Sequence, residues 1–284
     1  MALLGQGEGH GGISILHALG AGYGATIGID LTTKIRLRDN EPSKTADDPH
    51  GLLDAVVEVW KSAGLEVPAD NLYWQSRSTI PVGMGLKSSA AASVAAIRAL
   101  CEATETELGN DQIVDLAVQA QLMAGVSFTG SLDDAWAAVE PGWKIVDPNQ
   151  PASESIVLSG DIPDANDWKV MIILRGSRDY EIDPARFQLV GHQFEKAIQA
   201  VEQGNILVAM TENGRAVASA IDDPGGRRLS NDLFVWGARA GGITGSGPAL
   251  TAILPSNNES TLKRIEQYVR QRGLDIIITD FWVE

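Results

Sequence analysis

Residues 81–91 read Pro-Val-Gly-Met-Gly-Leu-Lys-Ser-Ser-Ala-Ala, and this stretch decides the fold. Its glycines allow backbone N–H groups to converge, and its two serines can cap the alanine-rich helix that we predict over Ser88–Thr104. A helix N-terminus carries a partial positive charge and unpaired N–H donors, so the stretch predicts a phosphate-binding site. It is not a Walker A loop, because Leu86 stands before Lys87 where that motif needs glycine. The alternative is a serine-capped helix behind a glycine turn, with no ligand.

The composition is that of an acidic globular chain. Its 284 residues suit one large or two compact domains, at ~150 residues per domain. The 22 basic and 37 acidic residues give a net charge of −15, which disfavours DNA and RNA as partners. Cys101 is alone, so no internal disulfide can form. The apolar runs fall far short of the ~20 residues of a membrane span and no secretion signal is evident, so we expect a soluble, cytoplasmic protein with no membrane partner.

Strands and helices alternate in both halves of the chain, which predicts an α/β or α+β protein of two domains. We place the linker in the Pro-, Ser- and Asp-rich stretch 149–165, and hence the domains at 1–155 and 156–284. The glycine clusters at 5–12, 20–28, 83–85 and 241–247 predict loops. Between the first two clusters, Ile13–Leu19 is expected to be a short helix, and a long helix is expected over Pro184–Gln203.

Several other motifs are weak. Gly7–Gly12 satisfies G-x-G-x-x-G and Asp30 follows at a suitable distance, but the strand that should precede a dinucleotide-binding loop is missing. A turn, or a loop near another ligand, is the better interpretation. The four histidines lack metal-ligand spacing, and no G-x-S-x-G hydrolase motif is present.

Three glycine-rich segments occur in the order typical of one family. The stretch 81–91 resembles the second signature of the GHMP kinases, Gly241–Ala249 resembles the third, and Gly9–Ile15 holds the place of the first. Within that family Lys87 and the T-G-x-x-D-D-A pattern of Thr129–Ala135 look like the archaeal-type shikimate kinases. The resemblance covers most of the chain.

The resemblance implies an α+β, two-domain GHMP kinase fold, with an N-terminal domain like domain 2 of ribosomal protein S5 and a ferredoxin-like C-terminal domain. It implies a cytoplasmic enzyme that uses ATP and Mg²⁺ to phosphorylate shikimate on the route to chorismate and aromatic amino acids. The alternatives are another GHMP kinase, acting on homoserine or mevalonate, and a nucleotide-binding protein of this fold without catalysis. The oligomeric state does not follow from the sequence.

The resemblance and the residue types together nominate a site. Asp133 is the candidate for orienting the substrate hydroxyl or accepting its proton, with Asp134 as its alternative and Lys87 as added positive charge. Ser89, or its neighbour Ser88, is the candidate ligand of Mg²⁺. The residues expected to bind ATP are Pro81, Val82, Gly83, Met84, Gly85, Leu86, Lys87, Ser88, Ser89, Ala90 and Ala91.

The substrate side of the site is less determined. An arginine suits the substrate carboxylate, and Arg175 and Arg178 are favoured over Arg36. Where mevalonate-kinase-like relatives supply a second acid to the metal, this chain has Gln119 and Gln121. The residues expected to bind substrate are His10, Gly11, Ser14, Thr129, Gly245, Ser246, Gly247, Arg175 and Arg178.

Overall fold

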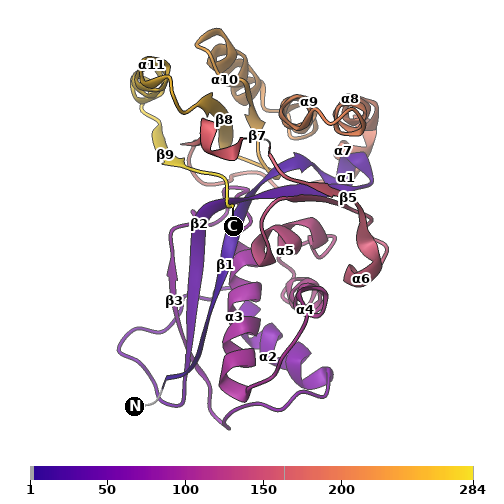
Figure 1. Cartoon of the computed structure of the whole chain (residues 1–284), viewed down its shortest axis with the longest axis vertical. Coiled ribbons are helices and arrows are strands. Elements are labelled where there is room, and N and C mark those ends of the chain that lie inside the picture. Colours follow the sequence, from indigo (N-terminus) through magenta and orange to yellow (C-terminus); the bar gives the residue numbers. More distant parts are fainter. Residues whose placement is uncertain (1–2, 163, 284) are drawn as a thin grey trace.

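The structure is a computed structural model that describes residues 3–162 and 164–283, and it contains two antiparallel sheets, one in each half of the chain (Figure 1). The first half holds the strands β1 (Leu3–Leu16), β2 (Gly24–Arg38), β3 (Tyr73–Ser78), β4 (Trp143–Val146) and β5 (Ile156–Gly160). Its helices are α1 (Ala18–Ala21), α2 (Leu52–Ser62), α3 (Ser88–Thr104), α4 (Asn110–Met123), α5 (Leu132–Val139) and α6 (Ala152–Ser155).

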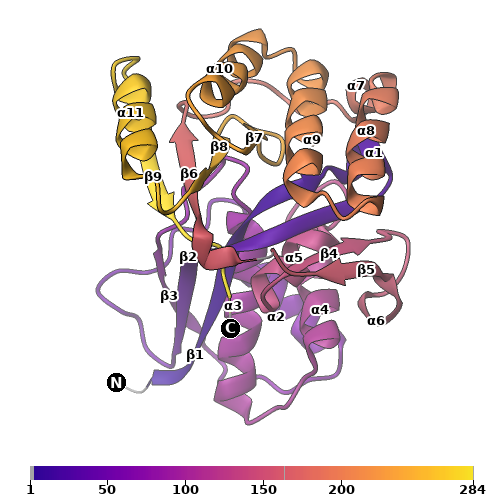
Figure 2. The same ribbon diagram turned by 45° about the horizontal axis from the view of Figure 1, so that its top comes forward.

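Strand β2 organises the first sheet. It pairs with β1 along its length, with β3 through residues 33–38, and with β4 through residues 24–27. Helices α2 to α5 lie on one side of this sheet, and the long strands β1 and β2 reach up toward the second half of the molecule (Figures 1 and 2). The α2–α5 layer and the face of the sheet it covers share one apolar core that includes Trp60 and Trp136.

The second half is a four-stranded sheet in the order β7-β8-β6-β9. In chain order the strands and main helices give β-α-β-β-α-β, so the expected ferredoxin-like arrangement is confirmed. Its strands are β6 (Trp168–Leu174), β7 (Ala240–Ile243), β8 (Leu250–Pro255) and β9 (Asp275–Thr279), and its helices are α7 (Pro184–Leu189), α8 (Gly191–Glu202), α9 (Ile206–Ala220), α10 (Pro224–Val235) and α11 (Glu259–Arg270).

The predicted glycine loop at residues 5–12 is wrong, because the whole stretch lies inside strand β1. The side chains at positions 5, 7 and 9 would face helix α3. A Cβ atom added at any of these three glycines would lie 2.2 Å from a backbone oxygen of α3, those of Ala99, Ala95 and Ala91 respectively. Two residues of strand advance about as far as four residues of helix, so each glycine meets an alanine along the same line. These glycines permit the close approach of strand and helix.

Three further sequence predictions are corrected. Ile13–Leu19 is not a helix, because β1 continues to Leu16 and its apolar residues there are buried in a strand. A short apolar run fits a buried strand as well as a helix, so its residue pattern could not distinguish them. The long helix expected over Pro184–Gln203 is two helices, α7 and α8, interrupted at Val190. The glycine turn expected from residue 241 begins only at Thr244, because Gly241 and Gly242 belong to β7, where a Cβ on Gly242 would lie 2.8 Å from the backbone of Gly214 in α9.

The two halves share a core and a pair of backbone contacts. One apolar cluster joins Ile13 and Ile27 of the first half to Ile172 and Ile253 of the second. The chain then descends from β9 to β2, where Asp30 N–H donates to Asp280 O (2.9 Å) and Trp282 N–H donates to Gly28 O (3.0 Å) (Figure 2). These contacts hold the second half against the middle of β2.

The division at residues 155 and 156 stays a prediction. Strand β5 follows that boundary but pairs with β4 of the first sheet. Grouped by strand pairing, the first domain would therefore extend to about Gly160.

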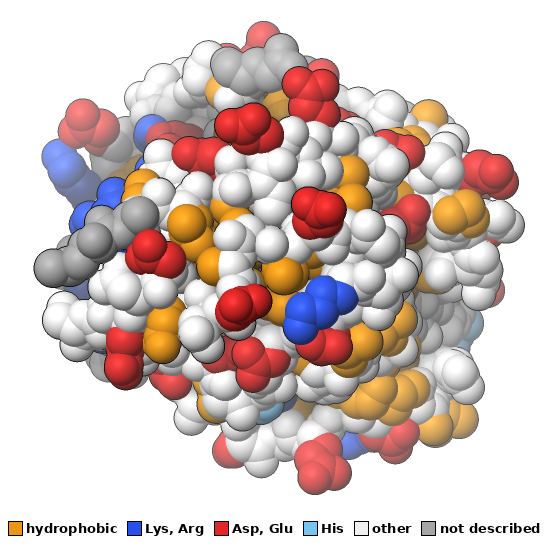
Figure 3. Space-filling view, turned by 90° about the horizontal axis from the view of Figure 1, so that it is seen from below, with side chains coloured by type: hydrophobic (Ala, Val, Ile, Leu, Met, Phe, Trp, Pro, Cys, Tyr) orange, Lys and Arg blue, Asp and Glu red, His pale blue; other side chains and the backbone are white. Residues whose placement is uncertain are grey.

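The surface is rich in acids, as the composition indicates. Asp and Glu side chains are spread over the face seen in Figure 3, where Lys and Arg are fewer. Among residues 3–162 and 164–283, no helix has the length and apolar character that a membrane crossing requires.

Candidate active site

A cleft of about 720 Å³ lies between the N-terminus of α3, the end of β1, and loops of the second half of the chain. Most of the predicted site residues meet there. Those that line it are Ser14, Val82, Gly83, Gly85, Lys87, Ser88, Ser89, Thr129, Asp133, Asp134, Arg178, Gly245 and Ser246.

The loop before α3 is held open toward this cleft by its backbone conformation. Gly83, Gly85 and Lys87 all have positive φ (71°, 81° and 67°), and Lys87 is the residue immediately before the helix. A Cβ on Gly85 would lie 2.2 Å from the backbone oxygen of Thr244, so only glycine permits the contact with the turn at 244–249. Ala249 N–H donates to Met84 O (3.3 Å) across the same junction. The two glycine segments therefore support each other, and the positive end of α3 is presented to the cleft.

Two adjacent carboxylates from the first turn of α5 converge on one hydroxyl and one ammonium group. The Thr26 hydroxyl lies 2.7 Å from Asp133 Oδ2 and 2.8 Å from Asp134 Oδ1, so it donates to one of them at a time. Lys87 Nζ lies 2.7 Å from Asp134 Oδ1, and both side chains are largely buried. Asp133 approaches so closely to β2 that a Cβ on Gly24 would lie 2.5 Å from its Oδ1. Thr26 and Gly24 were not predicted, since nothing in the sequence places β2 beside this motif.

The two carboxylates differ in charge state. Burial, together with the neighbouring Asp134, raises the pKa of Asp133 to about 7, and Lys87 and Thr26 only partly oppose the shift. Asp134 is the carboxylate that holds the lysine. Asp133 is therefore partly protonated near neutral pH.

Two oxygen donors stand beside the α3 N-terminus. The Ser89 hydroxyl donates to Gln121 Oε1 (3.2 Å). The fully buried Gln121 amide is held in this orientation because its Nε2 donates to Ala117 O and Gly130 O (3.3 and 3.1 Å). A hydroxyl and an amide oxygen suit Mg²⁺, which prefers oxygen ligands and usually keeps several waters. The described residues contain no cluster of three or more His, Cys, Asp or Glu side chains that would hold a metal by themselves. The donor set thus fits an ion that arrives with phosphate groups.

The two candidate arginines are placed differently. Arg175 forms an ion pair with Asp223, in which its Nη2 lies 2.9 Å from Asp223 Oδ1. Arg178 lines the cleft, and its Nη2 donates to the backbone oxygen of Gly247 (2.9 Å). No carboxylate of the described residues lies within ion-pair distance of Arg178. The structure therefore brings Arg178 and not Arg175 to the cleft, while Arg36 lies on β2 among the residues that pair with β3.

His10 is separated from the cleft. Its ring stacks on Trp282 with centroids 3.6 Å apart, and its Nδ1 lies 3.2 Å from Ile29 O. Ser14 and His10 both lie on β1, but the register of β1 against β2 shifts between His10 and Gly11, and only Ser14 reaches the cleft lining. Also outside the lining are Gly11, Pro81, Met84, Leu86, Ala90, Ala91, Arg175 and Gly247.

A histidine that the sequence analysis did not select lines the cleft instead. His17 follows the end of β1, and its Nε2 lies 2.9 Å from the Ser246 hydroxyl. Burial, with a smaller contribution from the nearby Lys87, lowers its pKa to about 3, so the ring is neutral. Further lining residues that the motifs did not indicate are Leu16, Ala18, Leu19, His50, Gly125, Val126, Ser127, Phe128, Ser131, Tyr180, Glu181 and Ile182. Tyr180 and Glu181 lie two and three residues after Arg178, so their closeness in sequence to a predicted residue was the signal available for these two.

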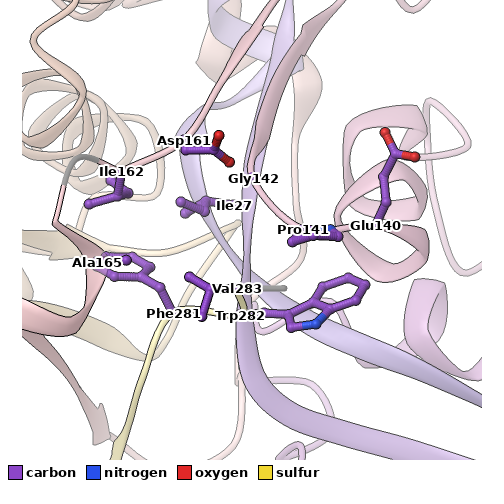
Figure 4. A pocket seen from close by; sticks show the side chains of 10 residues that line it. All are labelled: Ile27, Glu140, Pro141, Gly142, Asp161, Ile162, Ala165, Phe281, Trp282 and Val283. Atoms are coloured by element: carbon purple, nitrogen blue, oxygen red, sulfur yellow. The ribbon is translucent and has the colours of Figure 1, made fainter.

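A second hollow, of about 430 Å³, lies near the C-terminal segment (Figure 4). Ile27, Glu140, Asp161, Phe281 and Trp282 are among its lining residues. Of the lining side chains that the structure describes, none belongs to the predicted site.

Comparisons with known proteins agree with this architecture. Residues 52–142 match the family model of the GHMP kinases N terminal domain. A shikimate kinase of Pyrococcus furiosus is 28% identical over 286 residues, which cover 97% of this chain and 98% of that protein. A shikimate kinase of Methanothermobacter thermautotrophicus is 27% identical over 95% of this chain and 92% of that protein. The crystal structure of the Methanococcus jannaschii mevalonate kinase has a TM-score of 0.72 at 15% identity and covers 98% of both chains, a likeness of fold.

Proposed function

This chain belongs to the GHMP kinase family, and we propose that it transfers the γ-phosphoryl group of ATP to shikimate, giving shikimate 3-phosphate. The observation that carries the proposal is the meeting, in one cleft, of the α3 N-terminus with the Asp133, Asp134 and Lys87 cluster. The relatives named shikimate kinase, which match nearly the whole chain, support this acceptor over homoserine and mevalonate. Such a reaction between two small soluble molecules favours the cytoplasm as its place.

The loop 81–89 is suited to hold the phosphates. Phosphoryl transfer depends mainly on positioning and on neutralising negative charge that spreads over the transferred group. The backbone N–H groups at the start of α3 and the helix dipole supply fixed positive charge to the cleft without reorganising. Lys87, at the same helix end, adds a cation held in place by Asp134.

Asp133 is suited to accept the proton of the attacking hydroxyl. A general base works best with a pKa near the operating pH, and the pKa of Asp133 is raised to about 7. Asp134 fits a different role, because its charge is committed to Lys87. Thr26 would donate to Asp133 when that carboxylate is ionised and to Asp134 when Asp133 is protonated.

Mg²⁺ fits beside Ser89, whose hydroxyl lines the cleft and would contact an ion carried by the ATP phosphates, while the buried Gln121 accepts from that hydroxyl and holds it in place. When bound there, the ion neutralises charge on the phosphates. The neutral Gln121 adds no charge of its own, so this chain is expected to retain the ion only together with the nucleotide.

The acceptor is tested by coupled ADP release with Mg-ATP and shikimate, homoserine or mevalonate, at low and at high KCl. We expect turnover with shikimate and none with the other two. Turnover with homoserine or mevalonate alone would keep the kinase and overturn the acceptor. ATP binding without turnover on any of the three would favour a non-catalytic binder.

The arginines provide a matched pair for the carboxylate subsite. Arg178→Lys should raise KM for shikimate by about 10- to 100-fold, because lysine keeps the charge but cannot form the planar, bidentate pair of hydrogen bonds with a carboxylate. Arg175→Lys should leave KM within a few-fold and lower stability instead, because Asp223 loses its ion-pair geometry. The reverse result would assign the carboxylate to Arg175.

A further inference from the structure

His17 connects the end of β1 to two parts of the second half of the chain. Its backbone N–H donates to Asn213 Oδ1 on α9 (2.9 Å), and its Nε2 lies 2.9 Å from the Ser246 hydroxyl in the turn after β7. Its ring packs on Phe187, with centroids 4.5 Å apart. The imidazole is therefore fixed in place, with one nitrogen directed at a hydroxyl that lines the cleft.

Two buried polar atoms near this junction lack partners among the residues that the structure describes. They are His17 Nδ1 and Asn213 Nδ2, and the two side chains are neighbours through the hydrogen bond to the His17 backbone. Asn213 Nδ2 is a donor only. If Nδ1 carried the ring proton, both atoms would be donors, and a water between them would have to accept from both and leave its own two hydrogens for other partners. If Nδ1 is bare, a donor and an acceptor stand together, and one buried water can join them.

The protonation state of the ring follows from its surroundings. Burial and the cations Lys87, before α3, and Arg178, after β6, disfavour an imidazolium, while Asp134 on α5 only partly offsets them. A neutral imidazole carries one proton. With Nδ1 bare, that proton resides on Nε2 and is donated to the Ser246 oxygen.

Ser246 stands among groups that favour an anion. Arg178 donates to Gly247 O (2.9 Å), and the Tyr180 hydroxyl donates to Ser246 O (2.8 Å). Because Ser246 Oγ accepts from His17, its own hydrogen is not used in that contact and can turn toward the cleft. The hydroxyl and the Arg178 guanidinium then present donors to the same end of the cleft.

We propose that His17 is a positioning residue, which holds the Ser246 hydroxyl as a hydrogen-bond donor to the carboxylate of the bound substrate. The identity of the acceptor as the substrate carboxylate rests on the proposed function. The orientation of the imidazole does not depend on which substrate is bound. His17 contacts neither the phosphates nor the reacting hydroxyl in this role, so its effect is expected on substrate binding rather than on the chemical step.

The orientation is tested on the full chain by nitrogen-15 NMR of labelled histidines, from about pH 5.5 to about pH 8.5. His17→Gln removes one set of signals and so identifies those of His17. We expect a neutral ring with its proton on Nε2 throughout this range. A proton on Nδ1, or titration with an ordinary histidine pKa, would overturn the proposal whether or not shikimate is the substrate.

The effect on substrate is tested by steady-state kinetics with shikimate. His17→Leu should raise KM for shikimate by about 10-fold, the worth of one hydrogen bond to a charged group, while kcat and KM for ATP stay within about threefold. His17→Gln should restore KM, because its amide can still donate to Ser246. The double variant His17→Leu/Ser246→Ala should be no worse than Ser246→Ala, since both remove the same interaction.

Several results would contradict this role. Additive effects of the two substitutions, or equal losses in kcat and in KM for ATP, would show that His17 acts only in the structure. If His17→Leu does not fold, Ser246→Ala should still raise KM for shikimate and His17→Gln should still leave it unchanged, and failure of either result would contradict the role. His192→Gln, on the exposed surface of α8, is the matched control and should change nothing. Absence of turnover by the unmodified chain would overturn the proposed function and leave the NMR result to decide the orientation.

Discussion

Helix α3 meets glycine in two ways, along its side and at its N-terminus. Along its side, Gly5, Gly7 and Gly9 of β1 are present because any side chain would collide with the helix backbone. At its N-terminus, Gly83 has a positive φ of 71° and open space around the position of a Cβ. The first set is required by packing and the second by backbone conformation.

The difference separates stability from function. The β1–α3 interface is closely packed, and it fixes how α3 lies against β1. The N-terminus of the same helix ends in strained backbone and in a buried group of Asp133, Asp134 and Lys87. Buried charges and left-handed residues cost stability, and they persist where the surrounding structure holds them. Substitutions at the N-terminal site should therefore lower activity more than stability. Substitutions along the side of α3 should lower stability and leave activity nearly unchanged.

The largest effect is expected at the site end. Asp133→Asn should lower kcat by about 10²- to 10⁴-fold, as expected for loss of a general base. It should also raise Tm at pH 8, because the native pKa of about 7 lies above the ordinary 3.8. Between those values the native state binds more protons than the unfolded chain, so ionised Asp133 costs stability that grows as pH rises toward 7. Thermal unfolding at pH 5 and pH 8 with kinetics on the same samples measures both.

Asp134→Asn is the control for this prediction. It leaves Lys87 buried without its ion pair, so Tm should fall rather than rise. If both asparagine variants lose stability, Asp133 is not the strained member of the pair.

Next in size is the packing end. Gly7→Ala should cost about 3 kcal/mol or more in the free energy of unfolding, because its Cβ would lie 2.2 Å from Ala95 O and the backbone would have to shift. The kcat of the molecules that remain folded should be nearly unchanged. Urea denaturation measures the loss, with Gly191→Ala as control, since a Cβ there meets its nearest atom only at 3.8 Å. Equal stability of the two variants would refute the packing explanation.

A smaller effect is expected from pH. Protonation of Asp133 removes the base, so kcat/KM should fall about tenfold for each pH unit below about 7 and level off above it. His17, with a pKa of about 3, should contribute no step to this profile. A profile flat from pH 5 to pH 8 would argue against Asp133 as the base.

The smallest effect is expected from strain alone. Gly83→Ala places a side chain in a left-handed conformation at about 1 kcal/mol and should raise KM for ATP by about fivefold. Gly64→Ala carries the same strain beyond the end of α2, at φ 77°, with open space around it. It should cost similar stability and leave KM for ATP unchanged. If Gly83→Ala and Gly64→Ala raised KM for ATP equally, the cause would be a general loss of stability and not a change in the loop before α3.

The parts of the fold that sequence indicated are those with a strong local signal. The alanine-rich helix Ser88–Thr104 was predicted with its observed ends, because its alanines and the preceding glycines favour the same structure. The expected serine cap is wrong, since Lys87 and not a serine holds the N-cap position, and the Lys87 side chain makes no capping hydrogen bond. The glycines of β1 led to the wrong prediction of a loop where the structure has a strand. Their role depends on Ala91, Ala95 and Ala99, which lie far along the chain and cannot be inferred from the local composition.

The residues of the candidate site likewise fall into those that local motifs indicated and those that only the tertiary contacts bring together. Ser89, Lys87 and Asp133 were chosen from motifs, and the structure places all three on the cleft. His10 and Arg175 had the right residue types but are committed to Trp282 and Asp223 instead. His17 and Thr26 have no motif, and they enter the site only because the end of β1 and the start of β2 lie beside α5 and the turn after β7.

The sequence alone determined the helix with a positive N-terminus, the two glycine turns, the acidic pair and the kind of chemistry these groups suit. Each follows from residue type and spacing over a few positions, where backbone conformation and charge act locally. Only the tertiary structure decided which arginine and which histidine face the cleft, which carboxylate keeps the proton, and why β1 contains glycine. Those outcomes depend on burial and on contacts between distant segments, and both arise only when the chain packs.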